Sequence, residues 1–364
     1  MLKSLKILLC SLLGIILLAA GYSAVPRVTD PDPAYGVELK KSDILSAEVV
    51  AAIDDHFEND STYIDVIMAV QNNESIYEYG DVTRIMNGAS TRKAVLSLLY
   101  GIAIDQGLID LDMTLAELNI DENTPLTDQE KTATIRDLLM ARSGIYLPAE
   151  GEHDSQITDR PTRGSHLPGE FFFSNNFDYN ALGTIFIQET GQSIGQFMQD
   201  NLAEPLGMQD FDANNVVMGD PWFMPTNGSQ HDMYYMYTSA RDFARIGAMV
   251  ANNGMWDGKP VVPADWIALS TSPLSALKNS GRYTASGYIW WIDENSNTVW
   301  TDGYGGHYML IDPARNLTVV QRTFSGNSLL STGLWLAKSD RNAAHPKYMF
   351  HAYTMMIEEL DQQK

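Results

Sequence analysis

The chain has 364 residues, of which 45% are apolar and 19% charged, a composition typical of globular proteins and not of disordered chains. Asp and Glu number 46 against 24 Lys and Arg, giving a net charge of -22. Phosphate backbones and anionic lipids are therefore poor partners, so no nucleic acid is expected; the charge favours solubility and, as a second interpretation, cationic substrates. The single cysteine, Cys10, excludes a disulfide framework, and the seven scattered histidines make a metal site improbable, so we expect no metal.

Residues 1–24 have the organisation of an export signal peptide. Lys3 and Lys6 precede an apolar run from Ile7 to Ala20, and small residues follow. The run is short for a spanning helix of roughly 20 residues, so we expect a periplasmic or secreted protein, with an uncleaved N-terminal membrane anchor as the alternative. Residues 25–44 are rich in Pro and Asp and are predicted to be an exposed lead-in to a single domain over 45–364.

The predicted elements run from strands to helices and back to strands. A short helix at 46–57, a hairpin of strands 61–70 and 75–79 around Asn72-Asn73, and an apolar helix that stops at Gly107 come first. A mostly helical stretch follows, with helices ending at Gly144 and Gly191 and one helix capped by Ser239. Strand patterns return from 285 to 324, where Trp290 and Trp291 should face opposite sides, and a helix at about 345–360 closes the chain.

Strands at both chain ends with helices between them predict an α/β (α+β) fold. We expect one antiparallel sheet assembled from both ends of the chain and flanked by helices. A mostly helical subdomain is expected as an insertion at about 113–270.

Ser90-Thr91-Arg92-Lys93 forms a Ser-x-x-Lys sequence at the start of the apolar helix. Residues three apart lie on one helical face, so the hydroxyl and the amine can meet. A desolvated lysine can lose its proton near neutral pH and activate a serine, and the helix N-terminus offers N–H groups for an oxyanion. The alternative is an ordinary helix cap beside a surface lysine. The same spacing recurs at Ser275 and Lys278 in a turn-like stretch, so the tetrapeptide alone is weak evidence.

Several ordered blocks over roughly 45–360 resemble the serine β-lactamase and penicillin-binding-protein superfamily. The similarity is to its class-C-like branch of esterases, amide hydrolases and D-aminopeptidases. The blocks are Ser90-x-x-Lys93 with the following GIAIDQGLIDLDMTL, LLMARSGI at 138–145, PGEFFFSNNFDYNALG at 168–183, EPLGM at 204–208, TSARDFARIGAMVANNG at 238–254 and GYIWW at 287–291. The resemblance implies the β-lactamase/transpeptidase fold, Ser90 as nucleophile, Lys93 as general base, and no cofactor.

Two departures from the family pattern concern its second and third motifs. Phe173 is aligned with the tyrosine of the Tyr-x-Asn motif, and a phenyl ring cannot shuttle a proton. Asn175 is then the motif asparagine, for which the resemblance implies binding of the substrate and orientation of Lys93. The third motif, Lys-Thr-Gly in true β-lactamases, is replaced by the segment from Gly303 to His307, whose glycines allow close approach to substrate. A backbone N–H near Tyr304 is expected to complete the oxyanion hole with that of Ser90.

Other side chains could supply the missing hydroxyl. His307 is a candidate proton carrier, although a hydrogen bond to a loop is the favoured interpretation. The remaining candidates are tyrosines that could equally be pocket walls or core: Tyr146, Tyr179, Tyr234, Tyr235 and Tyr237.

The leading hypothesis is an exported serine hydrolase that cleaves a small ester, amide or peptide-like substrate through a Ser90 acyl-enzyme. The first alternative is a catalytically impaired relative that binds cell-wall or peptide ligands, since Phe173 lacks the motif hydroxyl. The second alternative is a true β-lactamase, which the absence of the Lys-Thr-Gly lysine disfavours.

Overall fold

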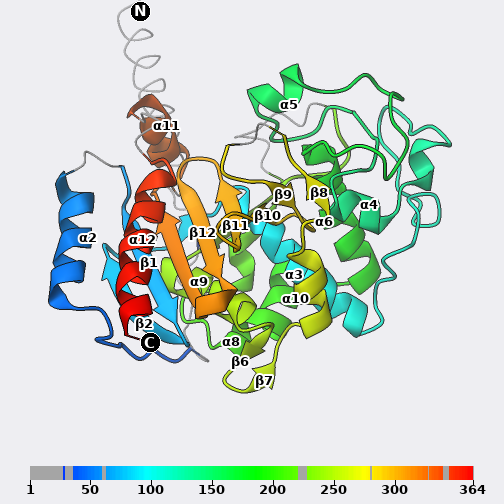
Figure 1. Ribbon diagram of the computed structural model, residues 1–364. Helices are drawn as coiled ribbons and strands as arrows, with labels where there is room; N and C mark the ends of the chain where they lie inside the picture. Colours follow the sequence, from blue (N-terminus) through cyan, green and yellow to red (C-terminus); the bar gives the residue numbers. More distant parts are fainter. Residues whose placement is uncertain are drawn as a thin grey trace, which may run out of the picture.

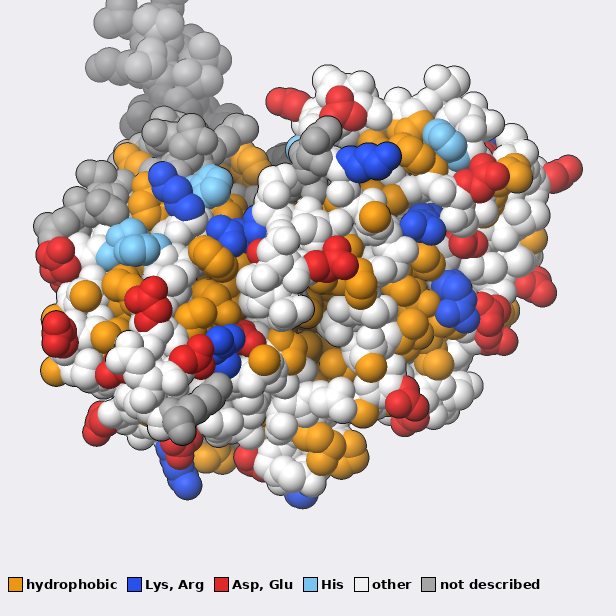
Figure 2. Space-filling view, viewed as in Figure 1, with side chains coloured by type: hydrophobic (Ala, Val, Ile, Leu, Met, Phe, Trp, Pro, Cys, Tyr) orange, Lys and Arg blue, Asp and Glu red, His pale blue; other side chains and the backbone are white. Residues whose placement is uncertain are grey.

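The computed structural model describes residue 28 and residues 36–59, 63–219, 228–278, 281–326, 328–338 and 344–363 (Figure 1). The expected signal peptide at 1–24, with Cys10, lies outside the described residues. Among the residues that are described, no helix combines the length and the apolar character needed to cross a bilayer. On the face drawn in Figure 2, the acidic side chains are spread among basic and apolar ones and do not form one patch.

The centre of the fold is an eight-stranded sheet made from both ends of the chain. Its strand order is β2-β1-β13-β12-β11-β10-β9-β8, and every neighbouring pair is antiparallel. The strands are β1 (Val66–Gln71), β2 (Glu74–Tyr79), β8 (Ser275–Ala276), β9 (Ala285–Ser286), β10 (Trp291–Asp293), β11 (Thr298–Gly303), β12 (His307–Asp312) and β13 (Leu317–Arg322). The predicted sheet and its hairpin are confirmed, and both hairpin residues, Asn72 and Asn73, have the positive φ that a tight two-residue turn needs.

Helices cover both faces of this sheet. α2 (Ala47–Asn59) and α12 (Lys347–Gln362) lie side by side on one face, and α3 (Thr91–Asp105) and α9 (Ala240–Ala251) pack on the other (Figure 1). Alternate residues of β1 therefore enter different cores: Val66, Met68 and Val70 face α3 and α9, and Ile67 and Ala69 face the terminal helices.

The middle of the chain forms the remaining helices and two small sheets beside the main sheet. The helices are α4 (Ile135–Leu139), α5 (Asp154–Thr158), α6 (Asn176–Thr190), α7 (Ile194–Met198), α8 (Glu204–Leu206) and α10 (Ala264–Ser270), with α11 (Leu329–Lys338) near the C-terminus. The small sheets contain β3 (Met86–Asn87), β4 (Val216–Met218) and β5 (Tyr234–Thr238), and β6 (Met255–Trp256) with β7 (Lys259–Pro260). Ser239 caps α9 as predicted, but α9 packs on the main sheet although it lies within the expected insertion.

Two predicted elements are shorter than expected. α4 ends at Leu139 and not at Gly144, because Ala141 turns the backbone to a φ of 53°. The strand predicted over 285–293 is interrupted after β9, where Ile289 has a φ of 66°. Trp290 and Trp291 nevertheless enter opposite cores, as the alternation predicts.

Candidate active site

Ser90 stands on a tight turn between β3 and α3. Ala89, directly before it, has a left-handed φ of 48°, and its N–H donates to Asn87 Oδ1 at 2.9 Å. Arg92 Nη1 donates to the Ala89 carbonyl at 2.9 Å and so holds the turn from the first helical residues. Ser90 is half-buried, and although it precedes the first turn of α3, its hydroxyl does not cap the helix. The hydroxyl is thus not engaged in the capping role that an ordinary serine would have here.

Lys93 lies one helical turn from Ser90 and is buried. Its Nζ donates to Asn176 Oδ1 at 2.9 Å and lies 4.3 Å from the centre of the Tyr179 ring. Burial lowers the pKa of the Lys93 amine well below its usual value, and the neighbouring Arg92 charge lowers it further, while Asp302 opposes the shift. An amine in this setting can serve as a base near neutral pH, because it is desolvated and beside a fixed cation.

The contacts place Asn176, and not the expected Asn175, against Lys93. The Asn175 Oδ1 accepts from Asp178 N at 3.0 Å and its Nδ2 donates to the Phe173 carbonyl, so Asn175 is the N-cap of α6. Because consecutive side chains at a helix start point in different directions, only one of the two asparagines can reach the amine. The role expected for Asn175 is therefore corrected by one position.

This shift makes the second motif Ser174-Asn175-Asn176. A Ser-x-Asn motif is the form found in many serine β-lactamases and penicillin-binding proteins, so the hydroxyl that Phe173 lacks is present on Ser174. Ser174 Oγ lies 3.0 Å from Tyr179 Oη, and the Tyr179 ring lies under the Lys93 amine. The sequence contains this signal, because Ser174 and Asn176 have the Ser-x-Asn spacing. The similarity of Phe to Tyr instead favoured an alignment of Phe173 and Asn175 with the Tyr-x-Asn motif, one residue earlier.

Phe173 takes no part in this group of polar side chains. Its ring packs edge-on against Tyr146 with centroids 5.8 Å apart, and its N–H donates to the Ala141 carbonyl. The Tyr146 hydroxyl lies 3.1 Å from His166 Nδ1.

Asn176 is itself held by buried neighbours. Gln156 Nε2, from α5, donates to the same Oδ1 at 3.3 Å and to the Ser174 carbonyl at 2.9 Å. The Asn176 Nδ2 donates to the Glu150 carbonyl at 3.0 Å. These bonds fix the amide so that its oxygen, and not its nitrogen, faces Lys93.

The end of β11 packs directly on the Ser90 turn. A Cβ added to Gly303 would lie 2.5 Å from the Gly88 carbonyl oxygen, so only glycine allows this approach. Thr301 Oγ1 lies 3.5 Å from the Thr91 carbonyl oxygen on the same side of the strand. Tyr304, the expected second oxyanion donor, directly follows Gly303 in the turn after β11.

Helix α11 covers the turn that contains Tyr304. The ring of Trp335 meets the Tyr304 ring edge-on at 6.0 Å, and a Cβ added to Gly305 would lie 2.9 Å from Trp335 Cζ2. Tyr304 itself remains 47% exposed.

His307 is buried below the site beside Arg322. Its Nδ1 accepts from Arg322 Nε at 3.2 Å, and the guanidinium also donates to Thr238 Oγ1 and to the Met86 carbonyl. Burial and the Arg322 charge lower the pKa of His307 well below its usual value. The hydrogen-bond partner of His307 is thus Arg322 of strand β13, and not a loop as the favoured interpretation expected.

The other candidate tyrosines are divided between the core and the walls. Tyr234 Oη donates to the Arg92 carbonyl at 3.3 Å, while Tyr235 and Tyr237 belong to a small buried cluster on β5. Of the five tyrosines proposed from sequence, Tyr179 is the one that contacts both Ser174 and Lys93. Ser275, the second Ser-x-x-Lys serine, is fully buried in β8.

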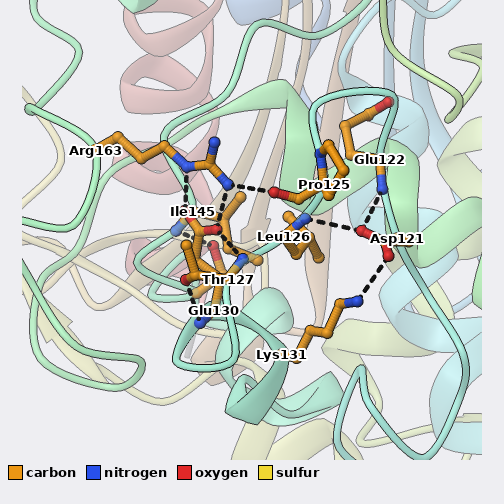
Figure 3. Close-up of polar contacts among 10 residues, drawn as sticks. Asp121, Glu122, Pro125, Leu126, Thr127, Glu130, Lys131, Ile145 and Arg163 are labelled. Atoms are coloured by element: carbon orange, nitrogen blue, oxygen red, sulfur yellow. Dashed lines mark hydrogen bonds and ion pairs between the residues drawn. The ribbon is translucent and has the colours of Figure 1, made fainter.

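A polar network fastens the outer loops that lead to the second motif (Figure 3). Arg163 donates to both Glu130 carboxylate oxygens at 2.8 and 2.6 Å and to the Pro125 carbonyl at 2.7 Å. Lys131 and Asp121 form a second ion pair at 2.6 Å. The segment that runs from Arg163 to Ser174 is therefore anchored at its start.

Residues 65–323 match the family model described as Beta-lactamase. The chain belongs to the Beta-lactamase family. An uncharacterized protein of Alkalihalophilus pseudofirmus is 25% identical over 255 residues, which cover 64% of this chain and 71% of that protein. Protein flp of Staphylococcus aureus is 27% identical over 153 residues, which span 36% of this chain and 30% of that protein. The resemblance stated from the sequence motifs is thus confirmed at the level of the family.

Solved structures share the fold at low sequence identity. A candidate 6-aminohexanoate-dimer hydrolase from Bacillus anthracis has a TM-score of 0.64 at 17% identity, covering 95% of both chains. A penicillin-binding protein homologue from Caulobacter crescentus has a TM-score of 0.58 at 16% identity, covering 88% of this chain and 99% of that chain. EstCE1, a hydrolase with promiscuous acyltransferase activity, has a TM-score of 0.55 at 16% identity, covering 82% and 98% of the two chains. The Beta-lactamase-family protein described here therefore has the fold of hydrolases and of a penicillin-binding protein homologue.

Proposed function

We propose that this protein is an exported serine hydrolase that cleaves an ester or amide bond through an acyl-enzyme. Ser90 Oγ attacks the carbonyl carbon while Lys93 Nζ takes its proton, and the tetrahedral oxyanion accepts from the N–H groups of Ser90 and Tyr304. The carbon–leaving-group bond then breaks, and the proton returns to the leaving group through Ser174. Water repeats the sequence on the acyl-enzyme and releases the acid.

The observation that carries the proposal is the Lys93 amine, buried one helical turn from Ser90 and bonded to Asn176 at 2.9 Å. A surface lysine beside a capping serine would show neither the burial nor the fixed acceptor. General acid–base help of this kind is typically worth 10²–10⁴-fold.

The catalytically impaired alternative was based on the missing hydroxyl of Phe173. Ser174 now supplies a hydroxyl 3.0 Å from Tyr179 Oη, so that reason no longer favours a binding-only protein. A true β-lactamase remains disfavoured, because the end of β11, from Thr301 to Gly303, carries no lysine to anchor a carboxylate.

A fluorophosphonate probe tests the proposal, with the labelled residue located by mass spectrometry. The label is expected on Ser90, and Ser90→Ala should remove both labelling and hydrolysis of short-chain p-nitrophenyl esters. Ser275→Ala is the matched control, since it removes a serine of the same spacing from β8. A folded wild-type protein that takes no label and hydrolyses no ester or amide would refute the proposal.

Export is part of the proposal and rests on residues 1–24. N-terminal sequencing of the protein recovered from cell fractions would test it. A mature N-terminus near residue 25 in the periplasm or medium is expected, and an intact N-terminus in the membrane fraction would favour the anchored alternative.

A further inference from the structure

Asp302 is a carboxylate at the edge of the candidate active site that the sequence analysis did not single out. It lies between Thr301, which faces α3, and Gly303, which packs on the Ser90 turn, so its side chain leaves the opposite side of β11. Asp302 is half-buried, and its Oδ2 accepts from Tyr283 Oη at 3.2 Å.

No described Lys or Arg forms an ion pair with Asp302. Arg282, beside Tyr283, stacks instead on Phe350 at 3.6 Å and approaches Asp293 at 3.8 Å. Burial raises the pKa of Asp302 to about 6, and the hydrogen bond from Tyr283 and the nearby Lys93 charge oppose the rise, yet the Lys93 amine donates to Asn176 and not to Asp302. Asp302 therefore lies next to Gly303, which packs on the Ser90 turn, and no cation is bound to its carboxylate within the described part of the chain.

Aromatic rings connect Asp302 with the second motif. Tyr283 stacks on Trp291, with centroids 5.5 Å apart and planes 14° from parallel. The ring of Phe172, two residues before Ser174, meets the Trp291 ring edge-on, with centroids 6.3 Å apart. All three rings are partly exposed, although Tyr283 and Trp291 also pack against the core under the terminal helices.

We propose that Asp302, Tyr283, Trp291 and Phe172 form a subsite for a substrate ammonium group, so that the preferred substrates are esters or amides that carry a positive charge. This inference rests on the proposed hydrolase function and names its substrate class. A carboxylate beside aromatic faces is the arrangement that binds ammonium and quaternary ammonium ions in water. The same carboxylate repels substrates with a carboxylate, and the net charge of -22 draws cations toward the protein.

Pairs of substrates that differ only in charge test the subsite. One pair is the p-nitrophenyl ester of γ-trimethylammoniobutyrate and its isostere with carbon in place of nitrogen, which put the charge on the acyl group. The other is acetylthiocholine and its carbon isostere, which put the charge on the leaving group. The kcat/KM ratio of cationic to neutral substrate should be about tenfold for at least one pair in the wild type.

Three variants distinguish the effect of the Asp302 charge on this ratio from the effects of its side-chain shape and of the net charge of the protein. Asp302→Asn should bring the ratio down to about threefold or less, and Asp302→Glu should retain most of it. Glu294→Gln, which removes an exposed acid at the opposite end of β11, should leave the ratio unchanged. A ratio that stays the same in Asp302→Asn for both pairs would overturn the subsite.

The outcomes distinguish this inference from the proposed function. If the wild type hydrolyses neutral esters through Ser90 but its kcat/KM ratio of cationic to neutral substrate is near one, the subsite is refuted and the proposed hydrolase function is retained. If no ester is hydrolysed, the binding of hexyltrimethylammonium measured by calorimetry tests the subsite independently of catalysis. Binding to the wild type that is weakened severalfold by Asp302→Asn supports it, and equal binding or none contradicts it.

Discussion

The assignment of Asn176 as the partner of Lys93 makes a strong prediction about two adjacent residues. Asn176 makes three hydrogen bonds to buried neighbours, to Lys93, Gln156 and the Glu150 carbonyl. At about 0.5–1.5 kcal/mol each, their loss in Asn176→Ala costs about 2–4 kcal/mol of stability. The unfolding entropy of a chain of this size is about 0.8 kcal/mol per degree, so the Tm should fall by roughly 3–5 °C.

Activity should separate the two positions more sharply than stability does. Asn176→Ala leaves the Lys93 amine without its acceptor, and kcat/KM for a p-nitrophenyl ester should fall by about 10²-fold or more. Asn175→Ala removes a helix cap that is worth about 1 kcal/mol, so it should lower the Tm by roughly 1–2 °C and change kcat/KM by less than about fivefold.

The measurements are steady-state kinetics and thermal unfolding followed by circular dichroism on both variants. The assignment fails if Asn175→Ala loses more activity than Asn176→Ala while both remain folded. Equal losses in both variants would mean that α6 as a whole, and not the amide of Asn176, positions the base.

Three further predictions follow from the same site. Ser174→Ala should slow amide hydrolysis by about 10²-fold and the hydrolysis of activated aryl esters much less, because a phenolate leaves without a proton. Phe173→Tyr should leave the amide rate unchanged. A higher amide rate in Phe173→Tyr would show that Phe173 occupies the motif position, as the sequence alignment expected. The pKa of Lys93 is lowered by burial and further by the charge of Arg92, so Arg92→Met should raise it. The acid limb of the pH profile of kcat/KM should then move to higher pH. An acid limb that does not move would count against Lys93 as the base. Burial raises the pKa of Asp178 to about 8, so the folded protein keeps a proton that the unfolded chain releases above about pH 4, and stability from this group is lost as the pH rises from about 4 to 8. Asp178→Asn should therefore raise the Tm relative to wild type by roughly 1–4 °C at about pH 8 and give no gain at about pH 4, as thermal melts at the two pH values would reveal.

The sequence alone determined the features that depend on local pattern. The periodicity of the strands at both chain ends predicted the sheet, and the spacing of Ser90 and Lys93 placed both on one turn of a helix. The hairpin at Asn72-Asn73 and the cap at Ser239 were likewise predicted, because a turn or a helix end is set by residues within a few positions of one another.

Only the tertiary structure decided which side chains meet across the site. Asn175 and Asn176 are adjacent and chemically identical, and the one that reaches Lys93 is set by how α6 packs on α3, at a separation of 83 residues. The proposed subsite depends on tertiary structure in the same way, because Tyr283 and Trp291 link Asp302 to Phe172, which is far from it in the chain. The Ser-x-Asn spacing of Ser174 and Asn176 is compatible with the Asn176 contact, but local pattern does not by itself choose between two adjacent asparagines, since the contact arises from packing that the whole fold imposes.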